Sequence, residues 1–281
     1  MPLPTLVSRN GKLIPPAQAN VSVFNPALYG AYGVYESLQV VHGVVFAQAA
    51  HLDRLAYSAA QLDLPLPATL PVFEQWIAEV LAANGAEDCT LRLLLIGPES
   101  RGETISFLWP QPAQAYDPDF YRLGARVITV EGQRAVPAAK SLNTLVSSLA
   151  RRRAGAAGAH EALLYHDGRL TEGSNSNLFA VIDGRLVTPP ASEVLSGVTR
   201  ELVLRLAAAH ALPTAEAALP LAEVTGWSEC LITSTSRHVM PVTFIDGRPV
   251  GSGQPGPVTQ DLAAWFEDYF RQATAAAVTR R

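Results

Sequence analysis

Lysine chemistry is confined to two positions of this 281-residue chain. Of its 21 basic residues only Lys12 and Lys140 are lysines, and the arginines cannot form an imine because their guanidinium groups stay protonated. Lys140 follows the small residues 137–139 and precedes a helical pattern, so an extended segment should enter a helix there. An exposed lysine is ordinary at such a place, so the residue alone leaves a functional and a structural role open.

Three polar segments could bind an anion or a ring nitrogen, and each also has an ordinary explanation. Residues 171–179 place Glu172 before small polar residues, directly after a hairpin strand, which indicates either a tight turn facing a ligand or a surface loop. Gly197 precedes an amphipathic helix whose free N–H groups could bind an anion, or whose start is simply capped by a hydroxyl side chain. Residues 233–236 are four hydroxyl side chains at the end of an apolar strand, which could bind phosphate or close the strand.

The amine, the carboxylate and the two anion-binding elements form the set of groups that pyridoxal 5'-phosphate (PLP) requires. The aldehyde of PLP takes a lysine, and its ring nitrogen takes a carboxylate that keeps the nitrogen protonated. Its phosphate takes helix N–H groups and hydroxyls, together with an arginine. The sequence therefore predicts a PLP-binding protein in which Lys140 carries the cofactor.

The elements expected in the first third of the chain mix strands and helices, which predicts an α+β unit. Their patterns are turn dipeptides between apolar flanks, helical apolar periodicity and a glycine stop. In chain order they are a hairpin with its turn at Asn10-Gly11, another at His42-Gly43, a helix from His51 whose apolar face is Leu52, Leu55, Ala59 and Leu62, a helix over 72–85 ending at Gly85, and paired strands at 90–97 and 103–110.

Residues 109–121 contain three prolines and several small or polar residues that break both periodicities, as in a linker. We therefore predict a small N-terminal α+β domain over 1–110, an interdomain linker over 111–122 and a large C-terminal PLP-binding domain over 123–281. The large domain should contain a strand at 125–130, a helix over 141–156, a strand meander over 161–190 with turns at Asp167-Gly168 and Asp183-Gly184, a helix from Thr199 and a strand at 229–236.

Composition narrows the class of protein further. Hydrophobic residues make up 48% and charged residues 16% of the chain, as in a globular protein rather than a disordered one. We expect no membrane span and no signal peptide, and hence a cytoplasmic protein. Cys89 and Cys230 belong to no paired motif, so neither a disulfide framework nor a metal site is expected. The basic run at 151–153 is interpreted as a solvated helix face rather than as a nucleic-acid contact.

Six motifs in register make the sequence similar to the class IV (fold type IV) PLP-dependent transaminases. That family includes branched-chain and D-amino acid aminotransferases, (R)-selective amine transaminases and aminodeoxychorismate lyase. The resemblance covers nearly the whole chain, and its motifs are Gly33-Val34-Tyr35-Glu36, His51-Leu52-Asp53-Arg54-Leu55, Lys140-Ser141-Leu142-Asn143, Thr171-Glu172-Gly173 with Asn177-Leu178-Phe179, Gly197-Val198-Thr199-Arg200, and Thr233-Ser234-Thr235-Ser236 with Pro241-Val242.

The resemblance implies a role for each matching residue. Lys140 would be the Schiff-base lysine and the proton shuttle, and Glu172 would pair with the pyridine nitrogen. Leu195 would pack against the ring. The residues that would bind the phosphate are Arg54, Val198, Thr199, Thr235 and Ser236.

The resemblance also implies a substrate pocket lined by Tyr35 and a structural role for His51. It further implies a homodimer. Each chain would have a small α+β domain and a larger barrel-like α/β domain, with PLP between the two domains. Around the substrate the sequence departs from the family. Gln39 stands where relatives place a basic pocket residue. The loop around Arg101 is short, with Glu103 where a carboxylate-binding histidine is usual.

Several activities remain open at this point. The leading hypothesis is an aminotransferase that moves an amino group between an amino acid, of D or branched-chain type, and a 2-oxo acid such as 2-oxoglutarate or pyruvate. The chief alternative is aminodeoxychorismate lyase, which eliminates pyruvate. An (R)-amine transaminase and a silent PLP-binding protein are further alternatives, the latter opposed by the intact Lys140 and Glu172.

Overall fold

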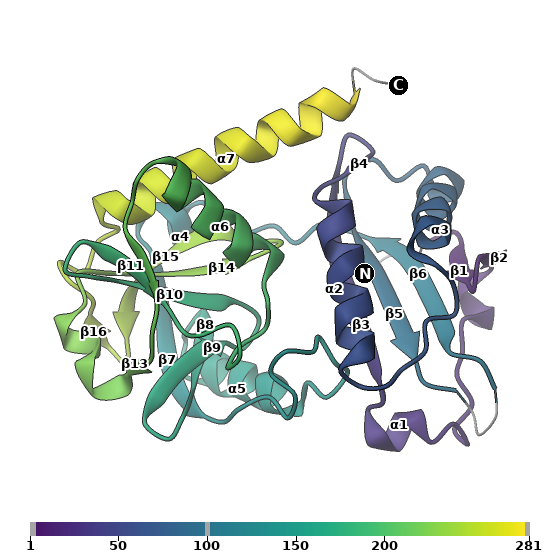
Figure 1. The fold of residues 1–281 in the computed structure, drawn as a ribbon, viewed down its shortest axis with the longest axis horizontal. Coiled ribbons are helices and arrows are strands. Elements are labelled where there is room, and N and C mark those ends of the chain that lie inside the picture. The colour runs from purple at the N-terminus through teal and green to yellow at the C-terminus, as the bar shows by residue number, and fades with distance from the viewer. Residues whose placement is uncertain (1–3, 99–101, 279–281) are drawn as a thin grey trace. The chain divides into compact units, whose positions relative to one another are not determined.

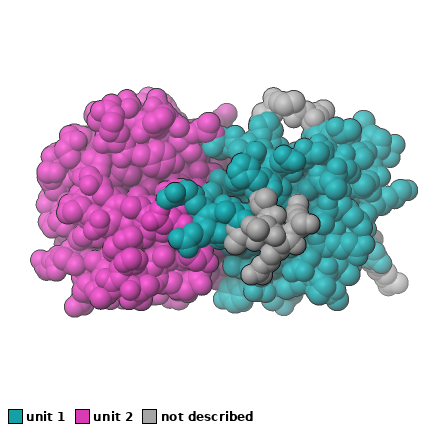
Figure 2. Space-filling model, turned by 90° about the horizontal axis from the view of Figure 1, so that it is seen from above, with its two compact units in different colours: residues 1–114, 139–143, 270–281 teal, residues 115–138, 144–269 magenta. Residues whose placement is uncertain are grey.

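The computed structural model describes residues 4–98 and 102–278. The chain forms two compact units, which Figure 2 distinguishes by colour. Unit 1 comprises residues 1–114, 139–143 and 270–281, and unit 2 comprises residues 115–138 and 144–269. No helix among the described residues is both long enough and apolar enough to cross a membrane.

Unit 1 is built on one antiparallel sheet of six strands in the order β2-β1-β6-β5-β3-β4 (Figure 1). Both predicted hairpins and the predicted strand pair are confirmed. The hairpin turns are local in origin, because Asn10 and His42 adopt a positive φ and a glycine follows each. The strands are β1 (Val7–Arg9), β2 (Lys12–Ile14), β3 (Gly33–Val41), β4 (Val44–Val45), β5 (Cys89–Ile96) and β6 (Ile105–Gln111).

Two helices, α2 (Gln48–Ala60) and α3 (Leu70–Asn84), cover one face of this sheet with the core of unit 1 between them and the strands. Helix α2 begins three residues before the predicted start, and Leu62 lies beyond its end. Helix α3 ends at Gly85 as predicted, in the left-handed conformation that a glycine adopts without strain. Unit 1 also contains the short elements η1 (Pro16–Gln18) and α1 (Ala27–Gly30).

The segment 139–143 belongs to unit 1, although the chain on both sides of it belongs to unit 2. It lies beside β3, where the Tyr35 backbone N–H donates to the Lys140 carbonyl at 3.0 Å and the Leu142 N–H donates to the Gly33 carbonyl at 2.9 Å. The backbone from the Lys140 carbonyl to Leu142 is therefore fixed by hydrogen bonds to a central strand.

The same pairing corrects the predicted helix over 141–156. Helix α5 is Leu145–Ala156, so the prediction is wrong over its first four residues. Ser141 forms a β-bridge with Val34 of β3, and this tertiary pairing overrides the local helical preference.

Unit 2 contains a closed barrel of six strands in the order β9-β10-β14-β15-β7-β8, because β10 pairs with both β9 and β14 and β8 pairs with β9. The predicted meander is confirmed, with its turns at Asp167-Gly168 and Asp183-Gly184. The strands of unit 2 are β7 (Ala125–Glu131), β8 (Glu161–His166), β9 (Arg169–Gly173), β10 (Asn177–Ile182), β11 (Arg185–Thr188), β12 (Thr214–Glu216), β13 (Leu219–Pro220), β14 (Glu229–Ser234), β15 (His238–Ile245) and β16 (Arg248–Pro249).

Each of the six barrel strands contributes apolar side chains to one buried cluster, so the barrel has a packed core. Helix α5 packs through Ala150 and Ala154 against β7 and β8. The remaining helices are α4 (Asp119–Arg122), α6 (Val198–Ala209), η2 (Leu221–Gly226) and α7 (Pro257–Val278).

The two compact units differ from the predicted domains at two places. The segment 139–143 and the residues from 270 onward belong to unit 1, and α4 occupies the end of the predicted linker 111–122. The boundaries predicted from the sequence, 1–110 and 123–281, stay a prediction, because contacts within one chain do not test which part folds by itself.

Candidate active site

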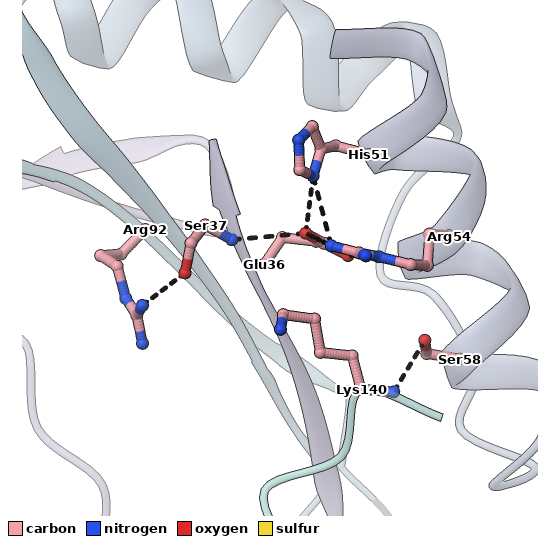
Figure 3. Close-up of polar contacts among 7 residues, drawn as sticks. All are labelled: Glu36, Ser37, His51, Arg54, Ser58, Arg92 and Lys140. Atoms are coloured by element: carbon pink, nitrogen blue, oxygen red, sulfur yellow. Dashed lines mark hydrogen bonds and ion pairs between the residues drawn. The ribbon is translucent and has the colours of Figure 1, made fainter. Parts of the chain in front are cut away.

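Lys140 lies against the open face of the sheet of unit 1. Its Nζ is 4.6 Å from the centre of the Tyr35 ring. Figure 3 shows the hydrogen bond that its backbone N–H donates to Ser58 Oγ, with a distance of 3.0 Å between the two atoms. Because side chains alternate along a strand, Tyr35, Ser37 and Gln39 share the face of β3 opposite the helices, and all three are only half-buried. The lysine is thus held at the edge of a partly open surface that a small molecule could reach.

Behind this surface, Glu36 points into the core and pairs with Arg54 of α2. Arg54 donates from Nε to Glu36 Oε1 at 2.7 Å and from Nη2 to Oε2 at 2.8 Å, which is a bidentate ion pair (Figure 3). His51 Nδ1 lies 2.9 Å from Glu36 Oε2. The carboxylate therefore fixes the guanidinium in one orientation.

The charges in this network follow from burial and pairing. Burial alone would raise the pKa of Glu36, but the charge and hydrogen bonds of Arg54, aided by His51, hold that pKa well below its usual range. Burial lowers the pKa of His51, so its imidazole is neutral at pH 7. Since a carboxylate only accepts, Nδ1 must carry the imidazole proton. Nε2 is buried and has no hydrogen-bond partner among the described residues. This agrees with a structural role for His51.

Arg92 of β5 is a cation that the sequence reasoning missed. It stands opposite Ser37 in the β3–β5 register and donates from Nη1 to Ser37 Oγ. Its guanidinium carbon is 5.3 Å from the centre of the Tyr35 ring, so two cations, Arg92 and Lys140, flank one aromatic side chain. Burial lowers the pKa of Arg92 from its ordinary value. No motif marked this residue, because only the pairing of β3 with β5 brings it to the open face.

In unit 2, the predicted site residues lie around Glu172. It lies at the end of β9, is 3% exposed, and its Oε1 is 2.8 Å from Nε of Arg134. This contact is an ion pair without the alignment of a hydrogen bond, since the Arg134 N–H does not point at the oxygen. Arg134 is itself buried, and a buried carboxylate needs such a partner. Arg134 was also missed, because it lies in an irregular segment far from Glu172 in the sequence.

The start of α6 is the candidate anion-binding element of unit 2. Gly197 is its N-cap residue and has no side chain that could cap the helix. The first-turn N–H groups of Val198 and Thr199 therefore face outward along the helix dipole. Leu195, two residues earlier, is buried, and its N–H lies 3.4 Å from Glu172 Oε2.

The four hydroxyl residues 233–236 divide between a strand and a turn. Thr233 lies in β14, and its Oγ1 is buried without a hydrogen-bond partner among the described residues. Ser236 lies in the turn between β14 and β15, with its Oγ 2.9 Å from the Tyr116 hydroxyl, and Thr235 is half-buried beside it. The turn itself is held by Arg237, which pairs with the buried Glu161 at 2.7 Å.

The predicted residues thus gather in two groups, each within one unit. Unit 1 holds Lys140, Tyr35, Gln39 and Arg54, and unit 2 holds Glu172, Leu195, Val198, Thr199, Thr235 and Ser236. Arg101 lies outside the described residues.

These groups fit PLP. Unit 1 has an amine on an open face. Unit 2 has a buried carboxylate paired with Arg134, a helix that starts at a glycine, and a buried hydroxyl, Thr233 Oγ1, without a hydrogen-bond partner among the described residues. These are the kinds of group that a cofactor with an aldehyde, a basic ring nitrogen and a phosphate requires. The profile of the amino-transferase class IV family matches residues 33–245, so the chain belongs to that family and is an aminotransferase with PLP as its cofactor.

Relatives support the same assignment over nearly the full length. A Methanocaldococcus jannaschii protein named, provisionally, a branched-chain-amino-acid aminotransferase is 35% identical over 274 residues, covering 92% of this chain and 94% of its own. D-alanine aminotransferase of Bacillus licheniformis is 29% identical over 285 residues, covering 96% and 98%. The T.th. branched-chain amino acid aminotransferase, solved with pyridoxamine 5'-phosphate, is 31% identical, with a TM-score of 0.86 and coverage of 97% and 95%. The predicted family, fold class, enzyme class and cofactor are confirmed.

Proposed function

We propose that this enzyme transfers the amino group of an aliphatic amino acid, of branched-chain type, to a 2-oxo acid such as 2-oxoglutarate. The observation that carries the proposal is the pair of cations at the Tyr35 ring. Lys140 supplies the reacting amine, and Arg92 supplies a second positive charge on the same face for a substrate carboxylate. Related solved structures support an aliphatic substrate: the T.th. enzyme was solved with 4-methylvaleric acid, and the Thermoproteus uzoniensis enzyme with norvaline.

Each residue would then act as follows. Bound PLP supplies an electron sink for the substrate carbon that loses its proton. Lys140 Nζ attaches the cofactor, then takes the substrate α-proton and returns it. Glu172 keeps the ring nitrogen protonated, and Leu195 packs on the ring.

We propose that the phosphate is bound by the guanidinium of Arg54 in the orientation that Glu36 fixes, by the α6 N–H groups, and by two hydroxyl residues. The hydroxyl residues are Thr235 and Ser236. Tyr35 and Gln39 would line the substrate pocket. For Arg101, which lies outside the described residues, a substrate contact remains a proposal from the sequence alone.

A second candidate substrate class is supported by relatives alone. Several proteins named D-alanine aminotransferase are about as similar to this chain as the branched-chain enzymes are, which favours a D-amino acid with pyruvate as the acceptor. One experiment separates the candidates. The holoenzyme is mixed with single D- and L-amino acids, and the loss of its yellow absorbance is followed without any acceptor.

Branched-chain L-amino acids should remove the colour fastest if the proposal holds. A preference for D-alanine would replace the substrate assignment. Retention of the colour with every amino acid, but release of pyruvate from aminodeoxychorismate, would replace aminotransfer by the lyase reaction.

We also propose that the enzyme is a cytoplasmic homodimer. Both cysteines are free and buried, which suits a reducing compartment. Unit 1 exposes an apolar cluster that water would not favour, with Phe24 at 88% and Tyr29 at 85% exposure, and α5 of unit 2 exposes Leu145 and Leu149. A second copy of the chain would cover these side chains. Sedimentation should give a dimer, and Phe24→Ser with Tyr29→Ser should shift it toward the monomer.

A further inference from the structure

The backbone of Leu195 is held from both sides by residues of a single motif in unit 2. Asn177 Nδ2 donates to the Leu195 carbonyl at 2.8 Å, and the Leu195 N–H lies 3.4 Å from Glu172 Oε2. Asn177 is 5% exposed and Glu172 is 3% exposed, so water competes little for either contact. Two sequence motifs that are separate along the chain are therefore joined through one residue.

The pairing of β9 with β10 explains why both side chains reach the same place. Asn177 lies directly opposite Glu172 in this register, and opposite residues of an antiparallel pair have their side chains on the same face. The four residues 173–176 close the turn between them, with the Gly173 N–H donating to the Ser176 carbonyl at 2.7 Å. A side chain at Gly173 would overlap Ser176, which accounts for the glycine after Glu172.

Asn177 also contacts the residue that begins α6. A Cβ atom added to Gly197 would overlap Asn177 Oδ1 and press on Arg200 of the first helical turn. The asparagine therefore fixes the segment 195–197 twice, by its amide N–H at Leu195 and by its oxygen against the Gly197 backbone. The position of the helix start depends on a side chain that lies beside the Glu172 carboxylate.

We propose that Asn177 is a positioning residue that keeps the start of α6 in register with the Glu172 carboxylate. This inference rests on the proposed roles of Glu172 and α6 as partners of the two ends of PLP. A rigid ligand gains the full benefit of two contact points only where their spacing matches its own length. Asn177 would maintain that spacing without touching the ligand.

The test uses Asn177→Leu, which keeps the approximate volume and removes the amide. Calorimetric titration of the full-length apo-protein is done with PLP, with pyridoxal, which lacks the phosphate, and with inorganic phosphate. We expect the Kd of PLP to rise about tenfold, equal to about 1.4 kcal/mol, which is the scale of one buried hydrogen bond. The Kd values of pyridoxal and of inorganic phosphate should each change by less than about twofold, because neither needs both ends in register.

Two further variants make the result decisive. Gly197→Ala displaces the same segment from its other side and should give the same selective loss of PLP affinity, also where Asn177→Leu folds poorly. Thr243→Val is the matched control, since it removes a part-buried side-chain hydrogen bond to the Leu123 carbonyl, at 3.0 Å in the same unit, and should leave all three Kd values unchanged.

The outcomes separate the inference from the function on which it rests. Parallel weakening of PLP, pyridoxal and inorganic phosphate would mean a general loss of structure, and unchanged affinities would mean no role, so either overturns the inference. Failure of the wild-type protein to bind PLP at all would instead overturn the proposed cofactor roles.

Discussion

The ion pair between Glu172 and Arg134 makes a quantitative prediction about Glu172→Gln. The substitution keeps the shape of the side chain but leaves the Arg134 guanidinium buried, at 8% exposure, without a negative partner. Removing one member of a buried ion pair costs about 3–5 kcal/mol, because the other charge stays enclosed. At roughly 2–4 °C per kcal/mol, the apparent Tm of the apo-protein should fall by about 6–20 °C.

A double variant separates this loss of stability from the loss of catalysis. Glu172→Gln with Arg134→Met removes both charges, and replacing a buried pair by apolar groups is often neutral, so most of the lost stability should return. Activity should not return. Without the carboxylate the ring nitrogen lacks its partner in both variants, and kcat should stay about a hundredfold or more below that of the wild type.

Scanning calorimetry of the apo-proteins and single-turnover absorbance of the holo-proteins measure the two effects separately. Both variants should still bind PLP through Lys140 and be yellow. A Glu172→Gln enzyme that deaminates its donor at the wild-type rate would show that Glu172 is an ordinary turn residue. A double variant as unstable as the single one would show that the loss of stability does not come from the unpaired charge of Arg134.

Three further predictions concern unit 1. Lys140→Ala should abolish turnover and the bound-cofactor absorbance, while the exposed Lys12→Ala should change neither, and peptide mapping after borohydride reduction should find the label on Lys140. Arg54→Ala should weaken PLP retention by about tenfold or more with little change in substrate preference, and a steep rise in substrate KM at unchanged cofactor affinity would place Arg54 in the substrate pocket instead. The pKa values of His51 and Glu36 are both lowered in the folded protein, so at acidic pH the unfolded chain binds more protons than the folded one. The free energy of unfolding should therefore decrease as the pH is lowered, first below about 6.5, where a free histidine takes up its proton, and more steeply below about 4.5, where a free glutamate does. Denaturant titrations at several pH values should show that the decrease between about 6.5 and 4.5 disappears in His51→Gln.

Local patterns predicted those parts of the fold that depend on neighbouring residues. The turn at Asn10-Gly11 and the end of α3 at Gly85 are set by the backbone freedom of one or two residues, which the sequence displays directly. The start of α5 was wrong because Ser141 pairs with a strand more than a hundred residues earlier. No periodicity within a segment can report such a pairing.

In the candidate site too, the sequence predicted residues that stand in local motifs and missed residues that act through distant contacts. Lys140, Glu172 and the glycine before α6 stand in recognisable motifs, and the sequence named all three. Three other residues were not assigned roles: Glu36, which pairs with Arg54, Arg92, which lies at Tyr35, and Arg134, which pairs with Glu172. Each acts through a contact that only strand register or loop packing creates. The sequence thus predicted the groups that would meet the cofactor better than the groups that hold them.

The division of the chain between the two units has a consequence for how the protein is made. The sheet of unit 1 is complete in sequence by β6, yet the segment that pairs with β3 comes from 139–143, and Phe270 of α7 packs on Phe46 with ring centres 4.7 Å apart. On the ribosome, the N-terminal sheet can therefore make these two contacts only after later portions of the chain have emerged, and Phe46 lacks its Phe270 contact meanwhile. Vectorial synthesis cannot give this unit its complete set of contacts before the barrel strands have been made.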